Sequence, residues 1–255
     1  MATALITGGT SGIGAEFARQ LAARGDDLVL VARNPDRLAE YATELKEQYG
    51  VAVETISADL GVREEVLQVA ARLGSTEQPI DLLVNNAGFG VSPPLATDDT
   101  AAQEYGLDVM IKAVLILAAA AGKAMKARGR GQIVNVSSTA GFIAMGLYSA
   151  IKAWVNTYSE ALANELRRHG VTVTALCPGF VRTEFHERAS IRTSSLPGPL
   201  WVDLGELVSE ALADVARGKV ISIPTRRFRV LMFVARHAPR SLVRAASRRL
   251  VSSRH

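Results

Sequence analysis

Short runs of β-branched and aliphatic residues alternate with longer segments of helical period along most of the chain, and this alternation constrains the fold more than any other feature. The runs read TALIT, DLVLVAR, VAVETIS, IDLLVNN, GQIVNVSS, VTVTALC and KVISIPT. Most are continuously apolar, as in parallel strands that are buried on both faces. Right-handed helical crossovers between such strands predict a doubly wound α/β fold with seven parallel strands, in which ligands bind beyond the carboxyl ends of the strands.

The chain of 255 residues shows no internal repeat and no Pro/Gly-rich joint that would divide it. We therefore expect a single α/β domain over residues 1–225, followed by a basic extension over 226–255. The Ser-, Pro- and Gly-rich segment 189–205 follows a strand end on the ligand side of the sheet. It is interpreted as a mobile loop and a candidate lid, with a simple connector as the alternative.

A glycine-rich turn, TGGTSGIG, follows the first expected strand and opens a helix, with glycines at 8, 12 and 14. Glycine is needed where φ is positive or where the backbone must approach a phosphate, and a helix N-terminus attracts the negative charge of a pyrophosphate. Because strand, turn and helix occur in the required order, the segment indicates a dinucleotide site that also involves Thr10 and Ser11.

The second strand ends in VLVARN. An acidic residue at this place would hold the ribose hydroxyls of NAD(H), whereas an arginine pairs with a 2′-phosphate. Arg33 therefore favours NADP(H) over NAD(H), the alternative being an ordinary solvated arginine in front of a helix.

The stretch VSSTAGFIAMGLYSAIKAW places a hydroxyl, a phenol and an amine close together, at Ser138, Tyr148 and Lys152. Tyr148 and Lys152 are four residues apart and so share one face of a helix. Carbonyl reduction needs an acid beside the developing alkoxide, and a nearby cation would lower the pKa of a tyrosine toward neutrality. Ser138 would donate a hydrogen bond to the substrate oxygen.

The spacing TGxxxGxG, the sequence NNAG at 85–88 and the pair Tyr148-x-x-x-Lys152 stand in one order over residues 3–223. Together they resemble the short-chain dehydrogenase/reductase family, in its compact single-domain branch with a Rossmann-type sheet. The resemblance implies cofactor contacts for Gly8, Gly12, Ile13 and Gly14 at the pyrophosphate, Asp59 and Leu60 at the adenine, Asn86, Ala87 and Gly88 below the ribose, and Pro178, Gly179, Val181 and Thr183 at the nicotinamide. Lys152 would also hold the nicotinamide ribose.

Two features depart from the family pattern. Members carry an asparagine that holds a relay water for the lysine, and alignment of GLDVMIKAV puts Met110 at that position. A thioether is only a weak acceptor, so the relay is expected to suffer. The loop between Ser138 and Tyr148 is also about three residues shorter than usual, a difference that would reshape the substrate pocket. Asn135 and Asn156 are polar alternatives for the relay, but are interpreted as a strand-end and a helix-surface amide.

The net charge of +4 conceals an asymmetry, because residues 216–255 hold eleven Lys or Arg and no acidic residue follows Asp214. Leu242, Ala246 and Leu250 would share one face of the last segment. This basic, amphipathic tail favours either peripheral contact with anionic lipid or docking against the acidic body or a neighbouring subunit. Sparse aromatic residues and the lack of a binding motif argue against nucleic acid.

Further composition bears on compartment and assembly. The single cysteine, Cys177, ends an apolar strand and is interpreted as a buried hydrophobe, so we expect neither disulfides nor metal sites. The chain opens on a strand, and its longest apolar run, 113–122, is about half of what a bilayer crossing needs, so we expect a cytoplasmic protein without a membrane span. A helix over 106–125 is apolar nearly all round, and the resemblance implies a homodimer or homotetramer.

The sequence therefore predicts an NADP(H)-dependent oxidoreductase that interconverts a carbonyl and an alcohol on a hydrophobic small molecule. The apolar content of the expected pocket, in residues 139–146, 89–92 and the segment from 184, supports such a substrate. The alternative is a sensor or scaffold protein that binds NADP(H) without turnover.

Overall fold

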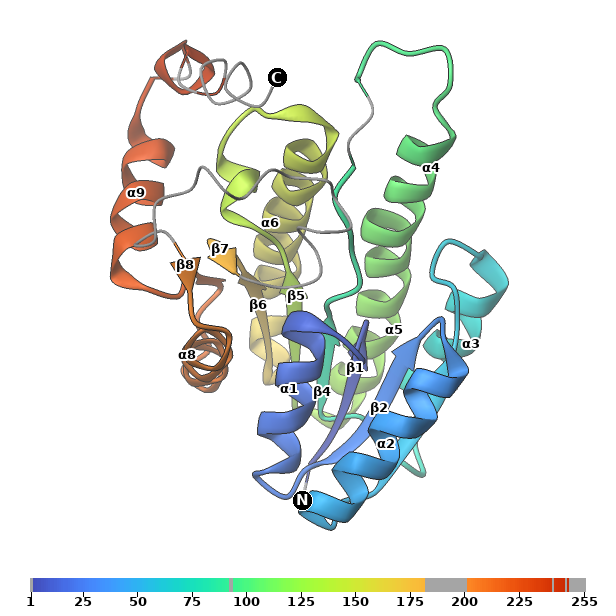
Figure 1. Ribbon diagram of the computed structural model, residues 1–255. Coiled ribbons are helices and arrows are strands. Elements are labelled where there is room, and N and C mark those ends of the chain that lie inside the picture. The colour runs from blue at the N-terminus through green and yellow to red at the C-terminus, as the bar shows by residue number, and fades with distance from the viewer. Residues whose placement is uncertain (1, 92–93, 182–200, 240, 246, 248–255) are drawn as a thin grey trace.

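The computed structural model describes residues 2–91, 94–181, 201–239, 241–245 and 247, which form a three-layer α/β structure (Figure 1). Seven parallel strands make up the central sheet, in the order β3-β2-β1-β4-β5-β6-β9. Their bounds are β1 Thr3–Thr7, β2 Asp27–Ala32, β3 Val53–Ser57, β4 Leu82–Asn85, β5 Gly131–Val136, β6 Val171–Leu176 and β9 Ile221–Ser222. The predicted doubly wound, Rossmann-type sheet of seven strands is thereby confirmed.

The direction of winding reverses at β1, which pairs with β2 on one side and with β4 on the other. A crevice opens at such a reversal, because the chain leaves the two neighbouring strands toward opposite faces. The glycine turn after β1 and the NNAG segment after β4 both lie at this crevice.

Helices cover both faces of the sheet and define two apolar cores. One face carries α1 Gly12–Ala22, α2 Pro35–Tyr49, α8 Leu204–Ala216 and α9 Arg226–His237. The other carries α3 Arg63–Leu73, α4 Ala101–Leu107, the π-helical turn η1 Asp108–Lys112, α5 Ala113–Arg128 and α6 Gly146–Leu166. Two 3-10 turns, η2 Thr139–Phe142 and η3 Arg167–His169, flank α6.

Helix α2 shows how local sequence sets these bounds. The Asn34 side chain accepts a hydrogen bond from the backbone N–H of Arg37, and Pro35 occupies the first helical position, where its missing N–H costs nothing. Gly50 ends the helix in the left-handed conformation, with φ of 71°.

The segment 101–128 forms one continuous helical rod, and by length and composition alone it could cross a membrane. Half of its most apolar window is buried inside the molecule, against α3, β4 and β5, as in the core helices of proteins that do not span membranes. Length and apolar composition are therefore weak evidence that this helix crosses a membrane.

A small second sheet pairs β7, Phe180–Val181, with β8, Trp201–Val202. The expected loop over 189–205 is therefore wrong at its end, because residues 201–202 form a strand and α8 begins at Leu204; residues 189–200 lie outside the described part. Two-residue strands carry too little pattern to be predicted. The expected seventh strand, KVISIPT, is also shorter than predicted, since only Ile221 and Ser222 pair with β6.

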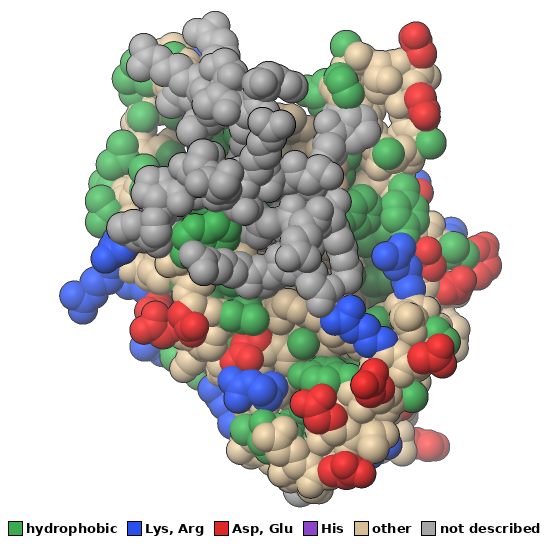
Figure 2. All heavy atoms as spheres, viewed as in Figure 1, with side chains coloured by type: hydrophobic (Ala, Val, Ile, Leu, Met, Phe, Trp, Pro, Cys, Tyr) green, Lys and Arg blue, Asp and Glu red, His purple; other side chains and the backbone are tan. Residues whose placement is uncertain are grey.

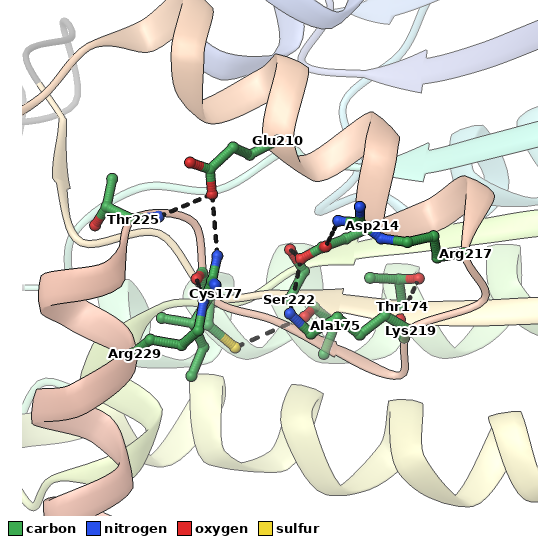
Figure 3. A network of polar contacts seen from close by, with 11 residues as sticks. Thr174, Ala175, Cys177, Glu210, Asp214, Arg217, Lys219, Ser222, Thr225 and Arg229 are labelled. Atoms are coloured by element: carbon green, nitrogen blue, oxygen red, sulfur yellow. Dashed lines mark hydrogen bonds and ion pairs between the residues drawn. The ribbon is translucent and has the colours of Figure 1, made fainter.

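A buried carboxylate, Asp214, and a half-exposed one, Glu210, fix the connection from α8 through β9 to α9 (Figure 3). Asp214 is 2% exposed and accepts hydrogen bonds from Arg217, from Lys219 at 3.0 Å and from Ser222 at 2.8 Å. Burial alone would raise the pKa of this carboxyl, but the three donors hold it below its ordinary value. Glu210 in turn accepts from the backbone N–H of Thr225 and from Arg229. The chain thus enters α9 in a defined direction.

Candidate active site

The glycine turn between β1 and α1 has the form that a pyrophosphate site requires. Gly8 and Gly12 have φ of 64° and 51°, which favours glycine. A Cβ on Gly14 would overlap the carbonyl oxygen of Gly8, so the turn can close only with glycine there. Among the described residues no side chain caps the helix at Ser11 and its first turn holds no acid, so the N–H groups and the dipole of α1 stay available to a phosphate.

The NNAG segment braces the glycine turn. The Asn86 side chain donates to the backbone oxygens of Thr7 and Gly8, at 2.9 and 3.2 Å. The backbone N–H groups of Asn86 and Ala87 both donate to the hydroxyl of Thr7, at 2.9 and 3.0 Å. Thr7 is 1% exposed, and its role was missed at the sequence level, where TGG drew attention only for its glycines. These contacts fix the crevice between the ends of β1 and β4.

Arg33, Asp59 and Leu60 lie together at the ends of β2 and β3. An additional residue from α4 joins them: the guanidinium of Arg33 donates to the hydroxyl of Tyr105 at 3.2 Å, and that hydroxyl donates to Asp59 at 2.8 Å. Tyr105 was missed because no sequence spacing links a helix residue to strand ends 46 and 72 positions away.

Ser138, Tyr148 and Lys152 converge at the carboxyl end of β5. Ser138 follows the strand and caps η2, where its hydroxyl accepts from the N–H of Ala140 at 3.1 Å. Tyr148 and Lys152 lie on the first two turns of α6, and the ammonium of Lys152 is 5.5 Å from the centre of the Tyr148 ring. Tyr148 also hydrogen-bonds with Ser138. The structure thus brings together the three side chains that the sequence singled out.

Burial governs the protonation of this group. Desolvation raises the pKa of Tyr148 above its ordinary value, and the hydrogen bond with Ser138 lowers it only in part. Desolvation also lowers the pKa of Lys152 to about 8, while the nearby Cys177 acts in the opposite direction. The expected fall of the Tyr148 pKa toward neutrality is therefore wrong for the protein by itself, because the loss of solvation outweighs the hydrogen bond with Ser138. Tyr148 is held as a neutral proton donor.

The ammonium of Lys152 donates to the backbone oxygen of Val136 at 2.8 Å. Met110 is 1% exposed and lies in the π-helical turn between α4 and α5, against Gly88. A Cβ on Gly88 would be 3.2 Å from the Met110 sulfur and 3.7 Å from the Lys152 nitrogen. An apolar, buried side chain thus stands at the position where the relay asparagine of the family is expected.

Two buried amides lie close to Lys152 along the chain or through its hydrogen bond. Asn156 follows it by one turn of α6, and Asn135 precedes its acceptor, Val136. Asn135 donates to the hydroxyl of Ser159 and accepts from Asn85, both at 2.9 Å, in agreement with a structural strand-end amide. Asn156 is 6% exposed and accepts from the thiol of Cys177 at 3.2 Å, so its interpretation as a surface amide was wrong. Burial raises the pKa of Cys177 to about 12, which leaves the thiol protonated and unreactive at neutral pH.

The segment after β6 would face the nicotinamide. Pro178 accepts from the backbone N–H of Thr139 at 3.0 Å, which ties this segment to the loop after Ser138. A Cβ on Gly179 would overlap the ring of Phe228 in α9, and Val181 is 4% exposed in β7. Thr183 lies outside the described residues. The expected alternative that the basic tail docks against the acidic body is confirmed for α9, which buries Phe228 and Met232 and pairs Arg229 with Glu210; that it packs on this particular segment was not predicted.

The C-terminal segment also backs the loop between Ser138 and Tyr148. Ser247 is 2% exposed, and its hydroxyl accepts from the N–H of Ala144 at 3.2 Å. The guanidinium of Arg236 lies 5.8 Å from the centre of the Phe142 ring and pairs with Glu160 on α6. The short loop is therefore supported from outside by α9 and by the chain that follows it.

Comparison with known proteins agrees with this geometry. The sequence model of the short chain dehydrogenase family matches residues 2–193. An uncharacterized oxidoreductase from Staphylococcus saprophyticus is 38% identical over 183 residues, which are 71% of this chain and 78% of that protein. A very-long-chain 3-oxoacyl-CoA reductase from Anas platyrhynchos is 36% identical over 190 residues, and the match spans 61% of that longer protein, less than two thirds.

Solved structures show the same likeness in three dimensions. A short-chain dehydrogenase from Sphingobium yanoikuyae, in complex with NADPH, is 37% identical with a TM-score of 0.84, over 91% of this chain and 92% of that one. A bulky-bulky ketone specific alcohol dehydrogenase from Comamonas testosteroni is 34% identical with a TM-score of 0.79, over 91% and 90%. The chain belongs to the short-chain dehydrogenase/reductase family, and it is an oxidoreductase of the kind that acts on CH–OH groups.

Proposed function

We propose that the protein interconverts a carbonyl and an alcohol on a hydrophobic small molecule with NADP(H), and that Tyr148 is the acid and base. The observation that carries this proposal is the convergence of Ser138, Tyr148 and Lys152 beside Gly88 of the NNAG segment, which braces the glycine turn. When bound, the nicotinamide supplies the hydride for reduction or accepts it in oxidation.

Each side chain has a distinct task in reduction. The neutral Tyr148 donates its proton to the oxygen of the substrate as negative charge develops there. Ser138 donates a hydrogen bond to the same oxygen, which stabilises the transition state. In the reverse direction Tyr148 must accept a proton, and a positively charged Lys152 favours its phenolate form.

The preference for the phosphorylated cofactor rests on Arg33 at the end of β2. A guanidinium there pairs with a 2′-phosphate, and an acidic side chain in its place would repel one. The likeness to a dehydrogenase bound to NADPH supports the same preference. We assign cofactor contacts to the residues predicted above, from Gly8 to Thr183.

A hydrophobic, bulky substrate suits the loops around Tyr148. Phe142, Ile143 and Met145 lie between Ser138 and Tyr148, and Phe89 follows NNAG. Trp201 is partly exposed in β8, whereas Phe185 and Ser92 lie outside the described residues. The selectivity of the Comamonas enzyme for bulky-bulky ketones supports this substrate class.

The decisive experiment follows nicotinamide absorbance over a panel of bulky ketones and their alcohols, with Tyr148→Phe as the matched variant. We expect turnover by the wild type and a loss of about 10²- to 10⁴-fold in kcat for the variant, with NADPH affinity within threefold. Turnover that survives in Tyr148→Phe would contradict the assignment. Tight NADPH binding without any Tyr148-dependent turnover would instead favour a sensor or scaffold, an alternative that the named relatives do not favour.

A homodimer or homotetramer would form through α5 and α6. Leu115 on α5 is 44% exposed, and Trp154 and Tyr158 on α6 stack at 4.7 Å in partly exposed positions. Association would bury this apolar area. Light scattering after size exclusion, with Leu115→Asp as the variant, tests the interface through a shift toward the monomer.

Helix α9 is a candidate for peripheral membrane contact of a cytoplasmic protein. Its inner face is anchored by Phe228 and Met232, whereas Val230, Leu231, Phe233 and Val234 are each more than half exposed. Figure 2 shows hydrophobic side chains along the left edge of the molecule, where Figure 1 places α9. Basic residues and no acid accompany them within α9. An apolar stripe among cations suits anionic lipid, and an isologous contact between two copies would oppose arginines.

Sedimentation with phosphatidylserine vesicles tests this contact directly. Phe233→Ser should weaken the binding of the full chain, and Leu67→Ser, which changes an exposed leucine on α3, should not. Equal partitioning of the wild type and Phe233→Ser would exclude the helix as a lipid contact. Of the three residues expected on one face, Leu242 is 62% exposed, and Ala246 and Leu250 lie outside the described residues.

A further inference from the structure

One tyrosine, Tyr105, connects Arg33 and Asp59, the two residues that form the adenine end of the site beyond β2 and β3. The hydroxyl of Tyr105 lies 2.8 and 3.0 Å from the two carboxylate oxygens of Asp59, and the Arg33 guanidinium donates to it at 3.2 Å. Asp59 also accepts from the backbone N–H of Gly61 at 2.8 Å. The segments that follow β2 and β3 thus meet α4 through a single hydroxyl group.

Packing fixes the Tyr105 ring in this place. A Cβ on Gly61 would overlap the edge of the ring, so the chain after β3 approaches the tyrosine as closely as glycine allows. On its other side the ring stacks with Phe89, with centroids 5.5 Å apart and planes inclined by 26°. The hydroxyl is therefore presented by a rigid support and not by a mobile surface side chain.

The hydrogen bonds have only one consistent direction. A carboxylate only accepts and a guanidinium only donates, so the Tyr105 proton must point to Asp59 and its oxygen lone pair to Arg33. Burial raises the pKa of Tyr105, and the Asp59 carboxylate raises it further, so the proton stays on the hydroxyl at neutral pH.

This arrangement has two consequences for a 2′-phosphate. Arg33 is exposed, and ordering such a side chain on binding costs conformational entropy unless another group already holds it. Tyr105 supplies that hold. The tyrosine proton also engages Asp59, whose negative charge would otherwise oppose an incoming phosphate.

We propose that Tyr105 is a positioning residue that selects the phosphorylated cofactor, because it holds Arg33 ready for the 2′-phosphate and engages Asp59. The inference rests on the proposed preference for NADP(H) and deepens it. Tyr105 itself touches neither the reacting atoms nor, in this scheme, the phosphate.

The test measures dissociation constants for NADPH and NADH by calorimetry in four proteins: wild type, Tyr105→Phe, Arg33→Gln and the double variant. Tyr105→Phe keeps the ring on Gly61 and Phe89 and removes only the hydroxyl. We expect it to weaken NADPH about tenfold and NADH less than twofold, the loss expected when a hydrogen bond to a charged group disappears. In the Arg33→Gln background the same change should alter NADPH affinity less than twofold, because the two residues act as one unit.

Tyr41→Phe is the matched control, since it also removes one tyrosine hydroxyl hydrogen bond, at 2.8 Å to the Ala15 oxygen, and this bond involves neither Arg33 nor Asp59. Its ratio of NADPH to NADH affinity should equal that of the wild type. A structural role for Tyr105 would weaken both cofactors equally and overturn the inference, as would tighter NADPH binding by Tyr105→Phe.

The outcomes separate this inference from the proposal beneath it. If the wild type prefers NADPH and Arg33→Gln abolishes the preference, but Tyr105→Phe does not change it, the cofactor assignment stands and the role of Tyr105 is refuted. If the wild type binds both cofactors equally and Arg33→Gln has no effect, both fail.

Discussion

The two ends of the site are held by different physical means. The adenine end, taken with the glycine turn beside it, is held by close packing of backbone atoms and by hydrogen bonds. Gly8 and Gly14 allow the backbone of the turn to close, and Tyr105 hydrogen-bonds the exposed Arg33. At the catalytic end Tyr148 and Lys152 are controlled by desolvation, which moves both pKa values away from their ordinary range.

This difference separates binding from chemistry along the sheet. Changes at the adenine end alter geometry and should appear in cofactor affinity. Changes at the catalytic end alter solvation and should appear in pH dependence and turnover. Each variant below tests one side of this division.

The largest effect is expected from Gly14→Ala. The new methyl group would overlap the Gly8 oxygen and press on the Asn86 amide, so the turn must open. We expect the affinity for NADPH and NADH to fall together by more than about 100-fold, because the pyrophosphate contacts common to both are lost. Calorimetry on the folded variant measures this.

Gly74→Ala is the control, since Gly74 ends α3 with φ of −81°, a conformation that alanine adopts freely. Normal affinity in that variant and lost affinity in Gly14→Ala would locate the effect in the turn. If Gly14→Ala binds either cofactor as the wild type does, rigid geometry is not what controls the adenine end.

The sequence allowed prediction of what depends on local pattern. Apolar runs revealed the strands, the glycine spacing revealed the turn after β1, and the interval from Tyr148 to Lys152 placed both on one helix face. These features are encoded within a few residues of one another, so periodicity and backbone preference suffice to find them.

What could not be predicted depends on contacts between distant segments. The bond from Arg33 to Tyr105 joins residues 72 positions apart, and β7 pairs with β8 over only two residues each. The burial of Phe228 and Met232 could not be predicted, because α9 carries apolar residues on both of its sides. The sequence does not indicate which side packs against the core. The π-helical turn at Met110 likewise has no local signature.

An intermediate effect is expected from Met110→Asn at the catalytic end. The amide would enter a site where Met110 is 1% exposed, and a buried amide without full hydrogen bonding costs about 1–3 kcal/mol. If the new amide binds a water beside Lys152, kcat should rise several-fold and the pH profile of kcat should change. Urea unfolding and pH–rate profiles measure the two effects.

Met125→Asn provides the comparison, because Met125 is equally buried in α5 but does not face the catalytic group. A similar loss of stability without a change in the pH profile is expected there. An unchanged profile in Met110→Asn as well would mean that solvent or another group already serves Lys152.

The smallest effect is a pH dependence of stability that isolates desolvation at Lys152. Its pKa is about 8 in the folded protein and 10.5 in the unfolded chain. Between these values the unfolded chain binds more protons, so the free energy of unfolding rises with pH there. From pH 7 to pH 9 the wild type should gain about 1.4 kcal/mol relative to Lys152→Met, measured by urea unfolding without cofactor.

The exposed Lys126→Met should follow the wild type across this range. A constant difference between the wild type and Lys152→Met would show that solvent still reaches the ammonium, and the contrast between the two ends of the site would then fail at its catalytic end.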